Sequence, residues 1–347
     1  MRATLLVLFP LGLLLVRCKQ NDTELQVGQL VTGITVGGTH ACALVVGGSM
    51  RCFGDDGAGQ LGDGEGALDA GTSHAVVGLI SVADIAAGYA HTCAKLEGSA
   101  MRCWGANDFG QLGDGTTVAR TTPAVLSLNN VYAIAAGGAH TCAVLNDRTV
   151  VCWGRNDNGQ LGDGSTTHRS LPVPVTGLVD VEELAAGQFH TCARLKDSTV
   201  RCWGRNDAGQ IGDGTIATPR YSPALIPALR DVKSISAGLA DTCAATNRGE
   251  VLCWGRGNAR SSPTAVSGFV EAEEVSLAAT PAVTELCARF RDHSVRCATA
   301  FGTTPRALAG ILNAVDIAAG GFGTCARSSN GALRCWQPGK DASSVVL

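Results

Sequence analysis

Short apolar runs separated by polar or glycine-rich breaks recur along most of this chain. The clearest begins each unit as alternating apolar and other residues and ends in Ala-Ala-Gly, as in VADIAAG at 82–88 and VEELAAG at 181–187. Alternation over so few residues is typical of a β-strand. The small residues at its end favour a crowded place where several strands converge on one axis, as the innermost strands of a propeller do. Related runs lie at 31–37, 131–137, 232–238 and 314–320.

Each of these strands is followed by two further apolar runs around a polar break. HTCAVL at 140–145 and TVVCWG at 149–154, for example, flank the three residues Asn146, Asp147 and Arg148. This pattern predicts a β-hairpin. A proline-containing run then ends the unit, and proline, which lacks a backbone donor, is tolerated on an edge strand. We expect these outermost strands at 122–126, 171–175, 222–226 and 262–266.

Cysteine spacing sets the number of units. Seven cysteine pairs each span ten positions, and the first members of successive pairs lie 51, 49, 50, 51, 44 and 38 residues apart. Such a period indicates a repeat architecture, so one closed array replaces the two or three domains that 347 residues would otherwise suggest. We predict an all-β, seven-bladed β-propeller of four-stranded antiparallel blades. The pairs are Cys42 with Cys52, Cys93 with Cys103, Cys142 with Cys152, Cys192 with Cys202, Cys243 with Cys253, Cys287 with Cys297 and Cys325 with Cys335.

Across a hairpin with a three-residue loop, the two cysteines of a unit lie directly opposite each other, close enough for a disulfide. We therefore predict one hairpin disulfide in each blade. Zinc is the disfavoured alternative, because nine intervening residues are unlike the short spacing of zinc knuckles and no paired histidines accompany them.

The start of the chain indicates export. An apolar run from Ala3 to Val16 has the length of a signal-peptide core and is short for a membrane span. An oxidising compartment also suits the paired cysteines. Cys18 resembles the lipobox cysteine of bacterial lipoproteins, although Arg17 stands where that motif has a small residue. Either Cys18 is lipidated and holds the chain in the cell envelope, or an ordinary signal sequence is removed and the chain is secreted.

These features divide the chain into a signal peptide at 1–18, a polar linker at 19–28 and a propeller at 29–347. The seven repeats are expected at about 29–79, 80–128, 129–178, 179–229, 230–269, 270–311 and 312–347.

Composition and motifs exclude several functions. The net charge is −3 and there is no basic run, which argues against nucleic acid as a partner. No nucleophile motif occurs, and the acids of the inner strands (Asp84, Glu183 and Asp316) come from different units, so no unit supplies a convergent pair. The loop at 156–164 fits neither an EF-hand nor a P-loop. We predict no catalytic residue, cofactor or metal.

Histidines recur in register at His40, His91, His140 and His190. A ring of imidazoles near the propeller mouth is one interpretation, and it would bind a metal. We favour the other, in which the histidine of each loop makes the same structural hydrogen bond.

Gly-x-x-His-Thr before the hairpin, Trp-Gly after it, and then Asn-x-x-Gly-Gln-Leu-Gly-Asp-Gly resemble the regulator of chromosome condensation repeat family over about residues 29–347. The resemblance implies a seven-bladed propeller. Members of that family act in nuclear guanine-nucleotide exchange, in ultraviolet-B reception in plants and, as secreted bacterial proteins, in the inhibition of β-lactamases. Nucleotide exchange takes place in a reducing compartment, which the predicted export and disulfides contradict. Ultraviolet reception uses tryptophans clustered on the surface, whereas the five tryptophans here occupy one repeated position. The paired cysteines look like an exported bacterial variant.

The variable positions carry the functional hypothesis. The turn after the inner strand holds Tyr89 in unit two, Gln188 and Phe189 in unit four, Leu239 in unit five and Phe322 in unit seven. Aromatic anchors dominate protein interfaces, so we predict a partner-binding rim here, the alternative being that these side chains plug the channel. The expected protein is a monomeric, non-enzymatic scaffold for an unidentified protein, with membrane contact only through a lipid anchor. An inhibitor of a secreted or periplasmic hydrolase, and a carbohydrate-binding or lyase-type propeller, remain alternatives.

Overall fold

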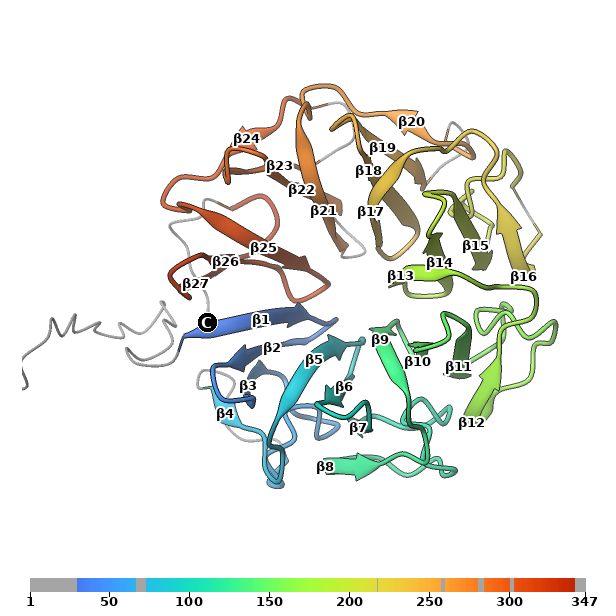
Figure 1. The fold of residues 1–347 in the computed structure, drawn as a ribbon, viewed down its shortest axis with the longest axis vertical. Coiled ribbons are helices and arrows are strands. Elements are labelled where there is room, and N and C mark those ends of the chain that lie inside the picture. Colours follow the sequence, from blue (N-terminus) through green and yellow to red (C-terminus); the bar gives the residue numbers. More distant parts are fainter. Residues whose placement is uncertain are drawn as a thin grey trace, which may run out of the picture.

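The computed structural model describes residues 30–66, 73–216, 218–256, 260–279, 284–299 and 303–340. All regular elements among them are β-strands, which form seven antiparallel sheets arranged around a central opening (Figure 1). Each sheet contains consecutive strands, and its first strand lies next to the opening. The described residues contain no helix long and apolar enough to cross a membrane. The predicted seven-bladed propeller is therefore confirmed.

The first four blades have four strands each. Their bounds are β1 Val31–Val36, β2 His40–Val45, β3 Ser49–Gly54 and β4 His74–Ala75; β5 Val82–Ala87, β6 His91–Leu96, β7 Met101–Gly105 and β8 Arg120–Val125; β9 Val131–Ala136, β10 His140–Leu145, β11 Val150–Gly154 and β12 Arg169–Pro174; β13 Val181–Ala186, β14 His190–Leu195, β15 Val200–Gly204 and β16 Arg220–Leu225.

Blades five and six also have four strands, and blade seven has three among the described residues. Residues 341–347, which we expected to add its outer strand, lie outside them. The bounds are β17 Val232–Ala237, β18 Asp241–Thr246, β19 Val251–Gly255 and β20 Thr264–Ala265; β21 Ala272–Ala279, β22 Thr284–Phe290, β23 Val295–Ala298 and β24 Arg306–Ala307; β25 Ala314–Ala319, β26 Thr324–Ser328 and β27 Leu333–Trp336.

All seven predicted disulfides are present, one in each hairpin, and every cysteine in them is buried. Because each sulfur is bonded to its partner across the hairpin, these cysteines supply no thiolate for the zinc alternative. The bonds join Cys42 to Cys52, Cys93 to Cys103, Cys142 to Cys152, Cys192 to Cys202, Cys243 to Cys253, Cys287 to Cys297 and Cys325 to Cys335.

The disulfide of blade three shows how these bonds are placed. Cys142 and Cys152 are directly opposite in the register of β10 and β11, with Cα atoms 4.1 Å apart. Both are fully buried in a cluster that also contains Leu161 and, from the next blade, Trp203. The disulfide therefore holds a hairpin together and also forms part of the apolar surface on which the neighbouring blade packs.

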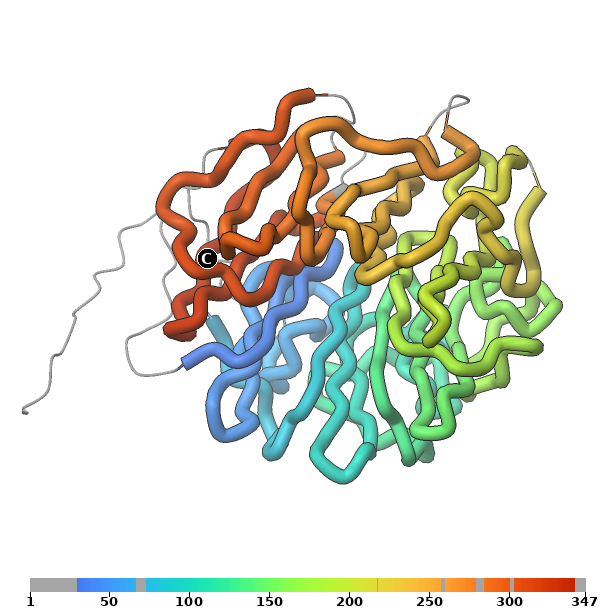
Figure 2. Tube along the Cα trace, turned by 45° about the horizontal axis from the view of Figure 1, so that its top comes forward, coloured from blue at the N-terminus to red at the C-terminus, as the bar shows by residue number. Residues whose placement is uncertain are grey.

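The ring closes where blade seven meets blade one, and β25 lies beside β1 in both views (Figures 1 and 2). The Phe322 N–H donates to the Gly37 carbonyl over 3.1 Å. The Phe322 ring meets the ring of Phe53 edge-on, with centroids 5.9 Å apart. We call this contact between blades seven and one the seam.

Removing one disulfide tests its contribution. Each bond closes a loop with a sequence separation of ten, for which loop-closure entropy gives about 2.5–3 kcal/mol. We expect C142A/C152A to lower the free energy of unfolding by about that amount in urea titrations. A loss well below about 1 kcal/mol would show that the hairpin stays closed in the unfolded chain without its bond.

Candidate functional site

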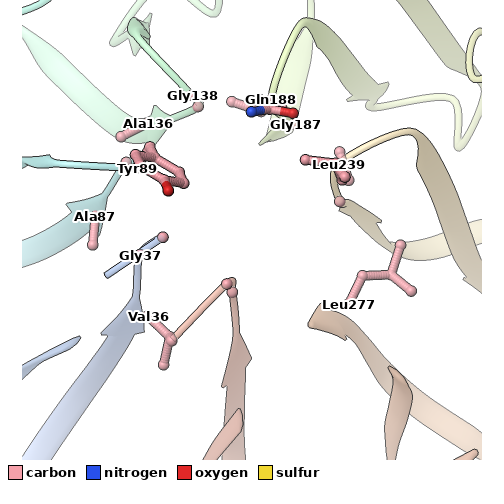
Figure 3. A pocket seen from close by; sticks show the side chains of 18 of the residues that line it. Val36, Gly37, Ala87, Tyr89, Ala136, Gly138, Gly187, Gln188, Leu239 and Leu277 are labelled. Atoms are coloured by element: carbon pink, nitrogen blue, oxygen red, sulfur yellow. The ribbon is translucent and has the colours of Figure 1, made fainter. Parts of the chain in front are cut away.

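A cavity of about 260 Å³ opens at one end of the central channel, where the turns between first and second strands of the blades meet (Figure 3). Its walls are mainly glycine and alanine, and the larger side chains include Tyr89, Gln188 and Leu239. None of the described residues that line it carries a charge. We call the surface around this cavity, formed by these turns and by the loops after each Trp-Gly, the mouth face.

Backbone hydrogen bonds between blades fix these turns. The N–H groups of Tyr89, Gly138 and Gln188 each donate to a glycine carbonyl of the next blade over 3.1 Å. This close approach of neighbouring blades explains why each inner strand ends in small residues. A Cβ on Gly137 would lie 2.4 Å from the Gly187 carbonyl oxygen and 2.3 Å from the His140 ring, so the neighbouring blade and its own histidine exclude any side chain there.

The structure divides the four residues predicted as a rim, together with Gln188 from the same turns, into three groups. Tyr89, Gln188 and Leu239 surround the cavity, and Figure 3 shows their side chains around its opening. Phe189 is not among the residues that line the cavity, and its ring contacts two arginines. Phe322 is half-buried in the seam, packed on Phe53.

Phe189 belongs to a row of stacked side chains that the sequence reasoning missed. The Arg155 guanidinium lies 4.7 Å from the Phe109 ring centroid and 5.0 Å from that of Phe189, and the Arg205 guanidinium lies 5.3 Å from the Phe189 ring centroid. We call Phe109, Arg155, Phe189 and Arg205 the stacked row. It crosses blades two, three and four on the mouth face. The sequence feature that could have indicated this row is the arginine that follows Trp-Gly in units three to five.

The recurring histidines make hydrogen bonds between blades. His140 Nε2 lies 2.9 Å from the Thr191 hydroxyl of the next blade, which itself donates to the Gln160 carbonyl over 2.9 Å. Because that hydroxyl has only one hydrogen, His140 Nε2 must be the donor. Trp203 Nε1 donates to the same carbonyl over 2.9 Å. We call this arrangement of histidine, threonine, tryptophan and glutamine carbonyl the clasp.

The clasp occurs at four successive interfaces, from that of blades one and two to that of blades four and five. At the remaining interfaces other side chains replace its members. At the interface of blades six and seven, the Glu285 carboxylate accepts from Thr324 and Trp336 over 3.3 and 3.2 Å. The clasps consist of His40, Thr92, Trp104 and the Gln60 carbonyl; His91, Thr141, Trp153 and the Gln111 carbonyl; His140, Thr191, Trp203 and the Gln160 carbonyl; and His190, Thr242, Trp254 and the Gln210 carbonyl.

Acidic residues of the inner strands pair within their own blades. Glu183 binds Arg194 over 2.9 Å, from the directly opposite position on the second strand, and Glu274 binds Arg289 in the same way over 2.9 Å. Burial, with the nearby Asp316 carboxylate as a further cause, raises the pKa of Glu274 to about 7. These acids therefore act as cross-strand partners of arginine.

The GQLGDG loops are also internally paired. Asp163 accepts from Ser165 and from Arg169, whose Nε lies 3.1 Å from the carboxylate. The hydrogen bonds hold the pKa of Asp163 below its usual value despite partial burial. The Asp163 carboxylate is therefore paired with an arginine of its own loop region.

Comparisons with known proteins identify the repeat. Two family models of the regulator of chromosome condensation (RCC1) repeat match, one at residues 103–144, 149–194 and 197–245, the other at 82–111, 131–160 and 181–210.

Solved structures share the fold. Prp20p from Saccharomyces cerevisiae is 19% identical over 90% of this chain and 84% of that chain, with a TM-score of 0.72. Human WBSCR16 is 16% identical over 85% of this chain and 86% of that chain, with a TM-score of 0.69. The ectodomain of the Arabidopsis thaliana receptor kinase ACR4 is 23% identical over 90% of this chain and 97% of that chain, with a TM-score of 0.56. At these identities the similarity shows a common fold alone.

The buried histidines predict a pH dependence of stability. Burial, with His190 as a smaller cause, lowers the pKa of His140 to about 3, whereas an unfolded histidine has a pKa of about 6.5. Between these values only the unfolded chain binds a proton at this ring, so the stability of the fold decreases as the pH falls. Each such group adds up to about 1.4 kcal/mol per pH unit to the slope.

We expect H140Q to make the slope of unfolding free energy against pH shallower by about 1.4 kcal/mol per unit between about pH 4 and 6. Its side-chain amide keeps a donor for Thr191, and the other titrating groups are common to both proteins. Urea titrations at several pH values measure the two slopes. Parallel slopes would mean that His140 is charged in the folded protein.

Proposed function

The chain carries regulator of chromosome condensation repeats between residues 82 and 245, and on this premise we propose that it is a non-enzymatic, extracytoplasmic scaffold that binds another protein through its mouth face. The contact residues in this proposal are the stacked row together with Tyr89 and Leu239 at the cavity.

The stacked row is the observation that carries the proposal. Aromatic residues and arginine are enriched at protein interfaces, and the residues that dominate binding energy are drawn from them. Here they alternate across three blades, and Asp157 and Asp207 pair with Arg155 and Arg205 beside them. These contacts restrict the side chains before a partner arrives, which lowers the entropy lost on binding.

The fold and the cysteines support the remaining parts. The structure of Prp20p is described together with its binding to Gsp1p and histones, so a propeller of this kind does bind other proteins. Seven buried disulfides suit an oxidising compartment, where such bonds persist. A hydrolase in that compartment is one class of partner for the same face, and capture experiments would identify it.

The test compares two pairs of substitutions on opposite faces. F189A/R155A removes the centre of the stacked row, whereas the control Y132A/R148A removes another arginine–aromatic contact, in which the guanidinium lies 3.6 Å from the ring centroid. Each protein is used to capture partners from envelope and secreted fractions of the producing cells. We expect F189A/R155A to weaken capture at least about tenfold, as loss of dominant contacts does, and the control to retain it. Equal capture by both variants, or equal loss, would contradict the proposed face.

A further inference from the structure

The loop between β3 and β4 of blade one differs in charge from the equivalent loops of blades two to four. Asp56 stands at a position that is asparagine in the other three loops. The aspartate of Gly-Asp-Gly, here Asp63, pairs through Oδ2 with His74 Nδ1 over 2.8 Å, whereas an arginine binds that oxygen in the other loops. The other loops have Asn107 and Arg120, Asn156 and Arg169, and Asn206 and Arg220 at these two places.

The loop of blade two shows what surrounds the asparagine. Asn107 Nδ2 lies between 3.0 and 3.3 Å from four oxygens, which are Asp114 Oδ1, the Thr116 hydroxyl and the carbonyls of Thr116 and Val118. Asn156 Nδ2 in blade three lies among four oxygens at the same range of distances. The amide nitrogen therefore occupies a cage of oxygens and supplies the hydrogens that they accept.

Asp56 points into the same place. Its Oδ1 accepts from the Leu61 N–H over 2.8 Å, as Asn107 Oδ1 accepts from the Leu112 N–H over 3.0 Å. Asp56 Oδ2 thus stands where blade two has the amide nitrogen. Asp56 is only 5% exposed, and none of the described residues donates a hydrogen bond to Oδ2.

The surrounding oxygens are kept in blade one. The Glu65 N–H donates to Asp63 Oδ1 over 2.9 Å, and the Thr116 N–H donates to Asp114 Oδ1 over the same distance. These matching contacts place Asp63 Oδ1 and the Glu65 carbonyl on the side of Asp56 Oδ2. We call Asp56, Asp63 and the Glu65 carbonyl the oxygen cage. It has lost its donor and gained a further acceptor.

The charges of the loop increase the need for a cation. Residues 54–66 contain four carboxylates and no lysine or arginine, whereas residues 154–166 contain two carboxylates and one arginine. Burial raises the pKa of Asp56, and the Asp63 and Asp55 carboxylates raise it further, against the opposing effects of the Leu61 N–H and His74. A buried carboxylate oxygen without a donor is costly unless a positive charge lies beside it.

We propose that the oxygen cage of blade one binds a calcium ion, which takes the place of the asparagine amide of the other loops. Calcium takes about six to eight oxygen ligands from carboxylates, backbone carbonyls and water, and it tolerates irregular geometry. Magnesium demands a nearly octahedral arrangement and suits such a cage less well. The proposal departs from our expectation of no metal, which rested on the loop at 156–164, where the position is asparagine.

The test compares D56N with D55N in the full chain. D56N restores the amide of the other three loops, so the loop folds without a cation. D55N is the matched control, because it removes the same charge from the adjacent residue. The Asp55 carboxylate accepts from the Gly57 N–H and from Gln60 and lies outside the oxygen cage. Each protein is freed of metal with a chelator and titrated with calcium chloride in a calorimeter at constant ionic strength.

We expect the unchanged protein and D55N to bind one calcium ion with a Kd of about 10⁻⁴–10⁻³ M, as extracellular modules do, and D56N to bind at least about tenfold more weakly. Free calcium at about ten times Kd should raise the ratio of folded to unfolded chain about tenfold in the first two proteins, measured by urea titration.

Four results would overturn the proposal. They are no calcium binding by the unchanged protein, equal binding by D56N, equal loss of binding in D55N, and equal stabilisation by magnesium. If calcium has no effect and stability falls as the pH rises, Asp56 holds a proton instead, which also overturns it. None of these results depends on whether the mouth face binds a partner protein.

Discussion

The interaction on which the ring depends is the sharing of one glutamine carbonyl between two side chains of the next blade. A single blade cannot bury both of its faces, so adjacent sheets must pack on each other. The threonine and tryptophan that reach across are fully buried and would lose stability if unpaired. The Gln160 carbonyl accepts from both Thr191 and Trp203, and His140 completes the arrangement. This satisfies the buried donors and sets the position of one blade on the next.

The seam shows what happens when the arrangement is lost as a unit. Gly323, Ala41 and Phe53 stand where the four clasped interfaces have histidine, threonine and tryptophan, and the contact becomes the apolar packing of Phe53 on Phe322. Removing all three polar partners together leaves no buried donor unpaired there. Apolar packing therefore replaces the clasp where the two ends of the repeat array meet.

The sequence predicted the blade number, the strand order and the disulfides, because these recur at fixed positions and each needs only residues of one repeat. It did not predict contacts made between repeats. The sequence places Phe322 in the same kind of turn as Tyr89 and so predicts the same role for both. In the structure Phe322 packs on Phe53, which belongs to the first unit and lies far away in the sequence. The stacked row likewise joins side chains from three units. The pairing of Glu183 with Arg194 was readable in principle, since opposite charges occupy facing positions of one hairpin.

Native-state hydrogen exchange tests most directly whether the clasp holds the blades together. Two amides that each donate to a glycine carbonyl of the next blade suit the comparison: Gly138 N–H donates across a clasped interface over 3.1 Å, and Phe322 N–H donates across the seam over 3.1 Å. If the clasp sets the strength of an interface, the Phe322 amide will exchange through an opening of lower free energy than the Gly138 amide. Equal or stronger protection at Phe322 would contradict the account.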